Sequence, residues 1–175
     1  MPTTPLIRGG IWPRNQADLA LQQGDYERAL PTLAKALELE RELENDGGIG
    51  WTLFNAALCL FHLEREEEAL VALRQAVTRS SNVVDIVDLI REFTLMGAIS
   101  ARRGDTRTAA ALLGFAGGLR DRSAFSYIGA EAELYRSTAT AVKEAIGEKA
   151  YGAQYVHGEE MSLDQAVAYA FASIA

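Results

Sequence analysis

The chain has 175 residues, enough for one continuous hydrophobic core, and 49% of them are hydrophobic. Its net charge of −7 gives it no general electrostatic attraction to nucleic acid or to an anionic membrane. No apolar run approaches the roughly 20 residues of a membrane span, and the N-terminus lacks the apolar stretch of a signal peptide. We therefore expect a cytoplasmic protein with no direct contact to nucleic acid or membrane. Cys59 is the only cysteine, which excludes an internal disulfide, and we expect it to be a buried apolar residue.

Helix signals follow a flexible lead-in, residues 1–12, that contains several proline and glycine residues. Ala and Leu are plentiful beyond it, and both residues favour helix. The sequence predicts helices at 13–23, 26–44, 50–63, 66–79, 83–103, 105–120, 129–146 and 148–156, and a last helix that begins at Ser162.

Capping residues mark several of the predicted helix ends. Gly24-Asp25 and Gly104-Asp105 predict junctions, because Gly accepts the left-handed conformation after one helix and Asp caps the next. Ser162 and Gln165 have the spacing of a capping box. Further turns are predicted at 45–48 and 80–82, which are rich in Asn, Gly and Ser.

Three segments align without gaps from Gly24, Glu64 and Gly104, at an interval of 40 residues. Small residues recur in each segment at fixed positions and allow close approach of two helices, and a leucine between them fills the space. The recurring positions are Ala29, Ala69 and Ala109; Leu33, Leu73 and Leu113; Ala36, Ala76 and Ala116; and, upstream, Ala17, Ala57 and Gly97. This pattern predicts three helical hairpins.

The run Gly24-Asp25-Tyr26-Glu27-Arg28-Ala29-Leu30 resembles the inter-helix signature of the tetratricopeptide repeat. The resemblance implies an all-α fold in which three hairpins over residues 13–120 form a right-handed superhelix. Residues 121–175 would then form a helical cap of the same domain, because the last repeat of such an array needs its apolar face covered. The chain departs from the family at Pro13 and Leu53, where an aromatic residue is usual, and in its period, which is usually about 34 residues.

The C-terminal third is also similar to the ends of large bacterial signal-transduction regulators, in which an NTPase module precedes a tetratricopeptide region and often a DNA-binding domain of winged-helix or LuxR type. The similarity rests on 103–114, Glu133-Leu134-Tyr135 and 161–167. It departs at Gly117-Gly118 and at 121–128. No phosphate-binding GxxxxGK[ST] loop occurs in the sequence, so ATP hydrolysis is not expected. The chain would be either a fragment of such a regulator or a small stand-alone relative.

No motif in the sequence indicates catalysis or a cofactor. His62 and His157 lie far apart and belong to no metal-binding or nucleophile motif, so we expect neither an enzyme nor a metal site. Glu159-Glu160 is the nearest approach to a carboxylate pair, and we interpret it as a solvated loop.

The family resemblance implies that the first helices of the hairpins line a groove for a protein or peptide. The groove residues it implies are Asn15, Asp18, Gln22, Asn55, Leu58, His62, Arg91, Thr94, Ala98 and Arg102. Two alternatives stay open: the chain fills this groove itself, and Asn55 is satisfied by a bond to its neighbouring helix. We predict a non-catalytic scaffold, the sensor or interaction region of a bacterial regulator, with a homodimer as a further option. The alternative function is a small-molecule effector domain.

Overall fold

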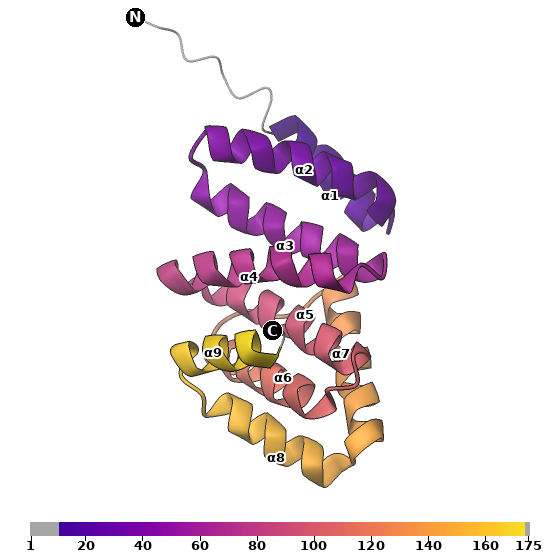
Figure 1. Cartoon of the computed structure of the whole chain (residues 1–175), viewed down its shortest axis with the longest axis vertical. Coiled ribbons are helices and arrows are strands. Elements are labelled where there is room, and N and C mark those ends of the chain that lie inside the picture. Colours follow the sequence, from indigo (N-terminus) through magenta and orange to yellow (C-terminus); the bar gives the residue numbers. More distant parts are fainter. Residues whose placement is uncertain (1–10, 174–175) are drawn as a thin grey trace, which may run out of the picture. The chain divides into compact units, whose positions relative to one another are not determined.

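The structure, a computed structural model, describes residues 11–173 and is entirely helical in secondary structure over that range (Figure 1). Its elements in chain order are α1 (Ile11–Gln22), α2 (Tyr26–Glu42), α3 (Asp46–His62), α4 (Glu66–Val83), α5 (Ile86–Arg102), α6 (Thr106–Asp121), α7 (Gly129–Ile146), α8 (Glu148–Glu159) and α9 (Leu163–Ser173). The predicted all-α class is confirmed.

The chain divides between Ala76 and Val77 into two compact units. The first unit holds α1–α3 and the beginning of α4, and the second holds the end of α4 and α5–α9. The predicted superhelix, and the predicted boundary between repeats and cap at residue 120, stay predictions.

The first six helices are joined by five turns of one kind. Each turn has one residue in the left-handed conformation, and these residues recur at intervals of 20: Gly24, Glu44, Glu64, Val84 and Gly104. The next amide bonds back to a carbonyl of the preceding helix, as in Asp25 N to Ala20 O (2.9 Å) and Asp105 N to Ser100 O (2.9 Å). This is the Schellman arrangement, and the side chains of Asp25 and Asp105 then cap the following helices, as predicted.

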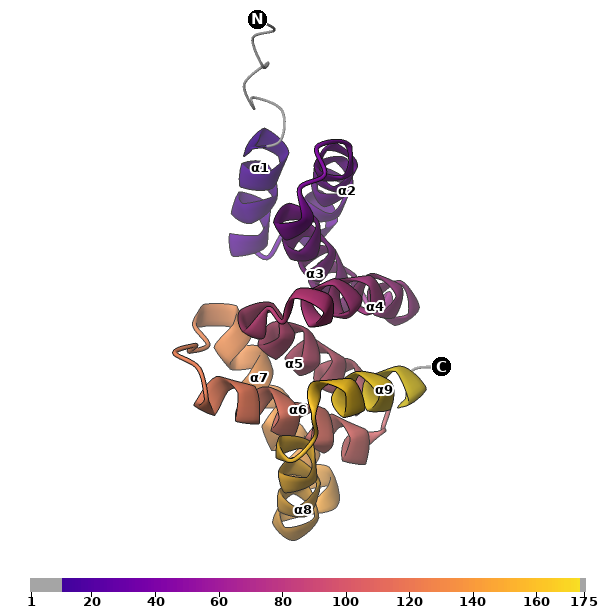
Figure 2. The same ribbon diagram turned by 90° about the vertical axis from the view of Figure 1, so that its left-hand side faces the viewer.

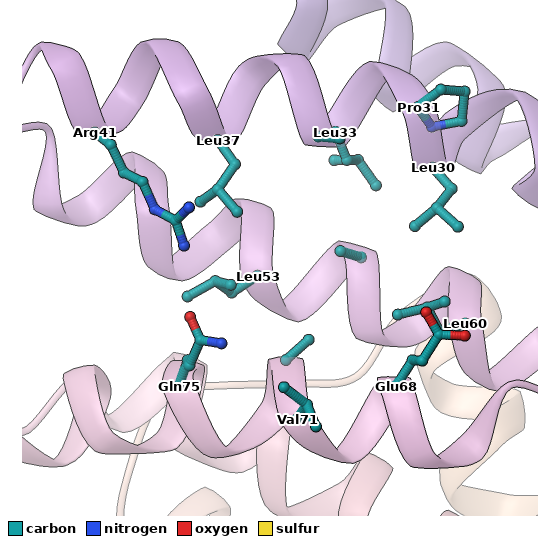
Figure 3. A pocket seen from close by; sticks show the side chains of 13 residues that line it. Leu30, Pro31, Leu33, Leu37, Arg41, Leu53, Leu60, Glu68, Val71 and Gln75 are labelled. Carbon is teal, nitrogen blue, oxygen red and sulfur yellow. The ribbon is translucent and has the colours of Figure 1, made fainter.

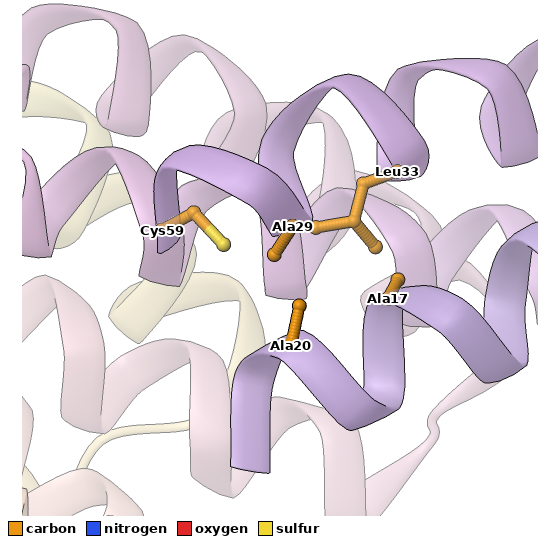
Figure 4. Packing of buried hydrophobic residues seen from close by; sticks show 5 residues of the cluster. All are labelled: Ala17, Ala20, Ala29, Leu33 and Cys59. Atoms are coloured by element: carbon orange, nitrogen blue, oxygen red, sulfur yellow. The ribbon is translucent and has the colours of Figure 1, made fainter. Parts of the chain in front are cut away.

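Small residues bring α1 and α2 together in the first unit. Ala17 and Ala20 of α1 face Ala29 and Leu33 of α2, and Cys59 of α3 completes the cluster (Figure 4). All five side chains are buried. Cys59 is fully buried in this cluster, which confirms its interpretation as a buried apolar residue, and burial raises the pKa of its thiol to about 12.

In the second unit, the hairpin of α5 and α6 follows the same rule. A Cβ at Gly97 would lie 3.3 Å from Leu113 Cγ, and Ala109 is fully buried against the same region. The predicted repeat positions therefore lie at helix crossings, as expected from their size.

Helix α8 packs closely along α6 (Figures 1 and 2). A Cβ at Gly158 would lie 1.9 Å from Ala111 O, and one at Gly114 would lie 2.0 Å from Tyr155 O. Gly117 leaves room for the Tyr155 hydroxyl, since a Cβ there would lie 1.8 Å from it. Gly117, which departs from the resemblance, is thus explained by this crossing, whereas a Cβ at Gly118 would meet nothing closer than 3.4 Å, an ordinary contact distance.

Helix α9 begins at the predicted capping box, in which Ser162 N donates to Gln165 Oε1 (2.8 Å) and Gln165 N donates to Ser162 Oγ (3.3 Å). It packs against α6. The apolar side of α7 is covered by α6 and α8 and not by α9, since Val142 packs against Ala109, Leu113 and Tyr151.

Several predicted boundaries were wrong. Helix α8 extends to Glu159, so Glu159-Glu160 lies at a helix end and not in a loop. Helix α3 begins at Asp46, because Asn45 caps it and Gly47 and Gly48 lie in its first turn. Residues 80–82 lie inside α4, and the turn follows at Val84, where no glycine marks it. The predicted lead-in lies mostly outside the described residues, but Ile11 and Trp12 already belong to α1, whose first turn accommodates Pro13.

Candidate partner-binding surfaces

A groove of about 500 Å³ runs through the first unit between α2 and α4, with α3 at its floor (Figure 3). Leu30 and Leu37 of α2, Leu53 and Leu60 of α3, and Val71 of α4 line it. Residues three, four or seven apart share one face of a helix, so α2 and α4 each present a continuous row of side chains to the groove.

The groove is apolar from floor to rim. Leu33 and Leu53 at the bottom are 0% and 4% exposed, whereas Val71 at the rim is 60% exposed. Pro31 and Ala34 extend the exposed apolar rim along α2. An apolar surface open to solvent is typical of a place where a partner binds.

The two ends of the groove carry different charges. At one end, the Arg41 side chain turns from α2 into the groove beside Leu37, and Gln75 of α4 lies at the same end (Figure 3). At the other end, Glu68 accepts two hydrogen bonds from the Arg65 guanidinium, at 2.7 and 2.6 Å, which lower the pKa of Glu68. Within residues 11–173, Arg41 forms no ion pair or side-chain hydrogen bond. The groove therefore ends in one unpaired cation and one satisfied ion pair.

The predicted residues of the first unit lie on α1 and α3, away from this groove. Asn15 and Gln22 are exposed, and Asp18 is partly buried, which raises its pKa despite the opposing charge of Arg14. Arg14 also lies over the Trp51 ring, 4.2 Å from its centre.

On α3, the predicted residues have local contacts. Asn55 Nδ2 donates to Trp51 O of its own helix (2.8 Å), and not to the neighbouring helix that the sequence alternative named. The His62 ring stacks on Tyr26, with 4.1 Å between the ring centres, and Leu58 is partly buried.

In the second unit, the chain itself covers part of the predicted surface. Arg91 pairs with Glu131 of α7 (3.0 Å) and with Asp88 (3.7 Å). Thr94 is buried and shares a 2.5 Å hydrogen bond with the Tyr127 hydroxyl.

Ala98 is also buried, whereas Arg102 is exposed at the end of α5. A partner-binding role for the residues of the predicted surface stays a prediction in both units.

The sequence analysis missed two buried acid–hydroxyl pairs. Thr52 Oγ1 of α3 donates to Glu40 Oε2 of α2 (2.7 Å). Ser80 Oγ of α4 donates to Glu92 Oε1 of α5 (2.8 Å). The 40-residue interval relates Glu40 to Ser80 and Thr52 to Glu92, so the alignment of repeats could have revealed both pairs.

Glu92 is fully buried, and its Oε2 has no hydrogen-bond partner in the described part of the chain. Burial raises the pKa of Glu92 to about 8, the hydrogen bond from Ser80 opposes this, and Asp88 and Asp85 add to it. Glu92 therefore binds a proton at neutral pH, which avoids the cost of a buried charge.

Among the described residues, no three His, Cys, Asp or Glu side chains gather closely enough to hold a metal ion. Within the same range, no helix combines the length and apolarity that a bilayer crossing demands.

Residues 11–81 match a protein-family model described as tetratricopeptide repeat. The match runs from the start of α1 to near the end of α4, and it supports the family that the sequence resembles. The described residues thus form an all-α fold of tetratricopeptide type. No similar protein was found among the curated proteins, and no similar structure among the solved structures.

Proposed function

We propose that this tetratricopeptide-like chain is a non-catalytic scaffold that binds an apolar segment of another protein in the groove between α2 and α4. Tetratricopeptide repeats generally mediate protein–protein interaction, and the family match includes all the residues that line this groove. The groove differs from the predicted surface, which lies on the first helices of the hairpins.

The observation that carries the proposal is the exposed apolar rim above a buried apolar floor. Val71 is exposed to water in the free protein. A partner that covers it would stabilise the complex by about 25 cal/mol for each Å² of apolar area buried. A binding segment would gain this free energy without any rearrangement of the floor, because Leu33 and Leu53 are already packed.

The wider setting that we propose is a bacterial signalling or transcriptional regulator, in which this chain is the interaction region. The support is the similarity of residues 103–114 and 161–167 to the ends of such regulators. A cytoplasmic location belongs to the same proposal, as does self-association into a homodimer.

A small-molecule effector site is the alternative function. The groove volume of about 500 Å³ lies within the range of small-molecule pockets, which supports it. Such pockets usually carry several convergent polar groups, however, and this groove has polar side chains mainly at its ends. A thermal-shift screen of metabolites separates the two functions, because a ligand that binds the folded state raises the melting temperature.

Selection from a displayed random-peptide library against the whole chain tests the proposal. We expect enriched peptides to be apolar and to lose binding to Val71→Glu, which places a charge on the rim. Val83→Glu is the matched control: Val83 is another exposed valine of α4, and it does not line the groove. Enrichment of no peptide, or of peptides that bind both variants equally, would contradict the proposal.

A further inference from the structure

We infer that the groove between α2 and α4 selects apolar segments that carry an acidic side chain at the Arg41 end, and so binds them in one direction. This inference rests on the proposed function and specifies the chemistry of its partner.

The apolar walls of the groove require the middle of a bound segment to be apolar. Leu30, Leu37 and Val71 offer no hydrogen-bonding atoms, so a polar side chain placed between them would lose its water without replacement. The row on α2 from Leu30 to Arg41 is about 16 Å long at 1.5 Å per residue. About five residues of an extended segment, or about three turns of a helix, would cover it.

The Arg41 end determines the charge. A segment that covers this end removes water from the guanidinium, which has no ion pair or side-chain hydrogen bond within residues 11–173. Glu38 and Glu42 lie on the same helix, but neither is paired with Arg41 in the part of the chain described. A carboxylate from the segment replaces the lost water with a charge-assisted hydrogen bond of matching planar geometry.

The Glu68 end does not impose the opposite preference. Arg65 already holds Glu68 with two hydrogen bonds, so a lysine of the segment would compete with an existing partner. One end therefore attracts a carboxylate while the other attracts neither charge, and this asymmetry determines the direction of binding.

The net charge of −7 makes the inference selective. The chain as a whole repels an acidic peptide, so an acidic preference must come from a local cation in or beside the groove.

The test uses synthetic copies of the peptides enriched by selection. Their binding affinity is measured by titration against three forms of the whole chain: wild type, Arg41→Glu and Lys35→Glu. Lys35 is an exposed cation of α2 outside the groove, so Lys35→Glu changes the net charge equally. Both substitutions are at exposed positions, and circular dichroism checks that each variant keeps its helices.

We expect the enriched peptides to share Asp or Glu at one end of their apolar run. Arg41→Glu should weaken their binding by about tenfold or more, and Lys35→Glu should change it by less than about twofold. Replacing the acidic residue of the peptide with lysine should restore binding to Arg41→Glu.

Two results would overturn the inference and leave the proposed function intact. One is a set of peptides that are sensitive to Val71→Glu but carry no shared acidic residue. The other is an equal effect of Arg41→Glu and Lys35→Glu. If no enriched peptide is sensitive to Val71→Glu, the proposed function itself fails.

Discussion

Each unit has one buried acid–hydroxyl pair at the same two positions of the repeat, but the acid and the hydroxyl exchange places. The acid comes first in the first unit, where Glu40 pairs with Thr52, and second in the other unit, where Ser80 pairs with Glu92. The residue near the buried acid also differs between the units: it is Gly48 in the first and Asp88 in the second. Gly48 leaves space for the Glu40 carboxyl, since a Cβ there would lie 2.7 Å from its carbon and from one of its oxygens. Its equivalent in the second unit is Asp88, whose charge raises the pKa of Glu92.

The units also differ in what covers them. The first unit leaves an apolar groove open, while the second lays α7, α8 and α9 on its hairpin. If the proposed function holds, one repeat pattern serves two purposes: binding in the first unit and internal packing in the second. The predictions below test, by stability measurements, the internal contacts in which the two units differ.

The largest expected effect is the pH dependence that Glu92 imposes. Its pKa rises from 4.5 to about 8 on folding, so the folded state binds more protons than the unfolded state between these pH values. The stability that protonated Glu92 contributes should be complete below pH 4.5 and should fall by about 4–5 kcal/mol in total as the pH rises from 4.5 through 8. Urea unfolding at several pH values measures this fall.

Glu92→Gln should flatten that pH dependence, because the amide cannot ionise, and should stabilise the protein at pH 9. Glu40→Gln, the same change at the buried acid of the first unit, is measured beside it for comparison. If the slope is the same in wild type and Glu92→Gln, the buried acid is not its source.

Gly158→Ala should have the next largest effect, a loss of about 3 kcal/mol, because its Cβ would overlap the Ala111 carbonyl and backbone cannot move aside easily. Gly152→Ala in the same helix is the matched control, since a Cβ there meets nothing within 4 Å. The control should gain about 0.5–1 kcal/mol. Equal effects would mean that α8 does not pack against α6 at Gly158.

Removing the two hydroxyls compares the pairs directly. Thr52→Val leaves the buried Glu40 carboxyl without its donor, at a cost of about 1–3 kcal/mol. Ser80→Ala should cost about 1 kcal/mol at pH 6, where Glu92 is protonated, and more at pH 9. Denaturant midpoints at the two pH values measure both costs, and a pH-independent cost for Ser80→Ala would contradict the assignment of Glu92.

The smallest effect concerns a turn. Val84 is a branched residue at φ 55°, where Gly24 and Gly104 serve in equivalent turns. Val84→Gly should raise stability by about 0.5–1 kcal/mol, since the strain of about 1–2 kcal/mol outweighs the added chain entropy. Thermal unfolding measures the shift, and a lower melting temperature would show that the valine is not strained.

The sequence predicted the fold correctly wherever a residue contributes through its small size or by ending or capping a helix. Ala29, Leu33 and Gly104 were placed correctly because small residues, a filling leucine and a left-handed glycine have one main use at helical spacing. The turn at Val84 was missed because its conformation is held by the flanking hydrogen bond from Asp85 N to Ser80 O, and the residue itself gives no signal.

The groove between α2 and α4 could not be predicted from the sequence, for a different reason. Leu30, Leu37 and Val71 have the spacing of ordinary core positions, and only the separation of α2 from α4 leaves them facing solvent. That separation is a property of packing and not of local pattern. Likewise, Arg41 is one of several charged residues near the end of α2, and only the three-dimensional structure shows that no other described side chain pairs with it.

Hydrogen–deuterium exchange of the full chain, with and without a selected apolar peptide, tests binding in the groove most directly. We predict added protection in the backbone amides of α2 from Leu30 to Arg41 and of α4 from Glu68 to Gln75, with no change in α5. Protection confined to α1 and α3 around Asp18 and Asn55, or to the second unit, would contradict the account.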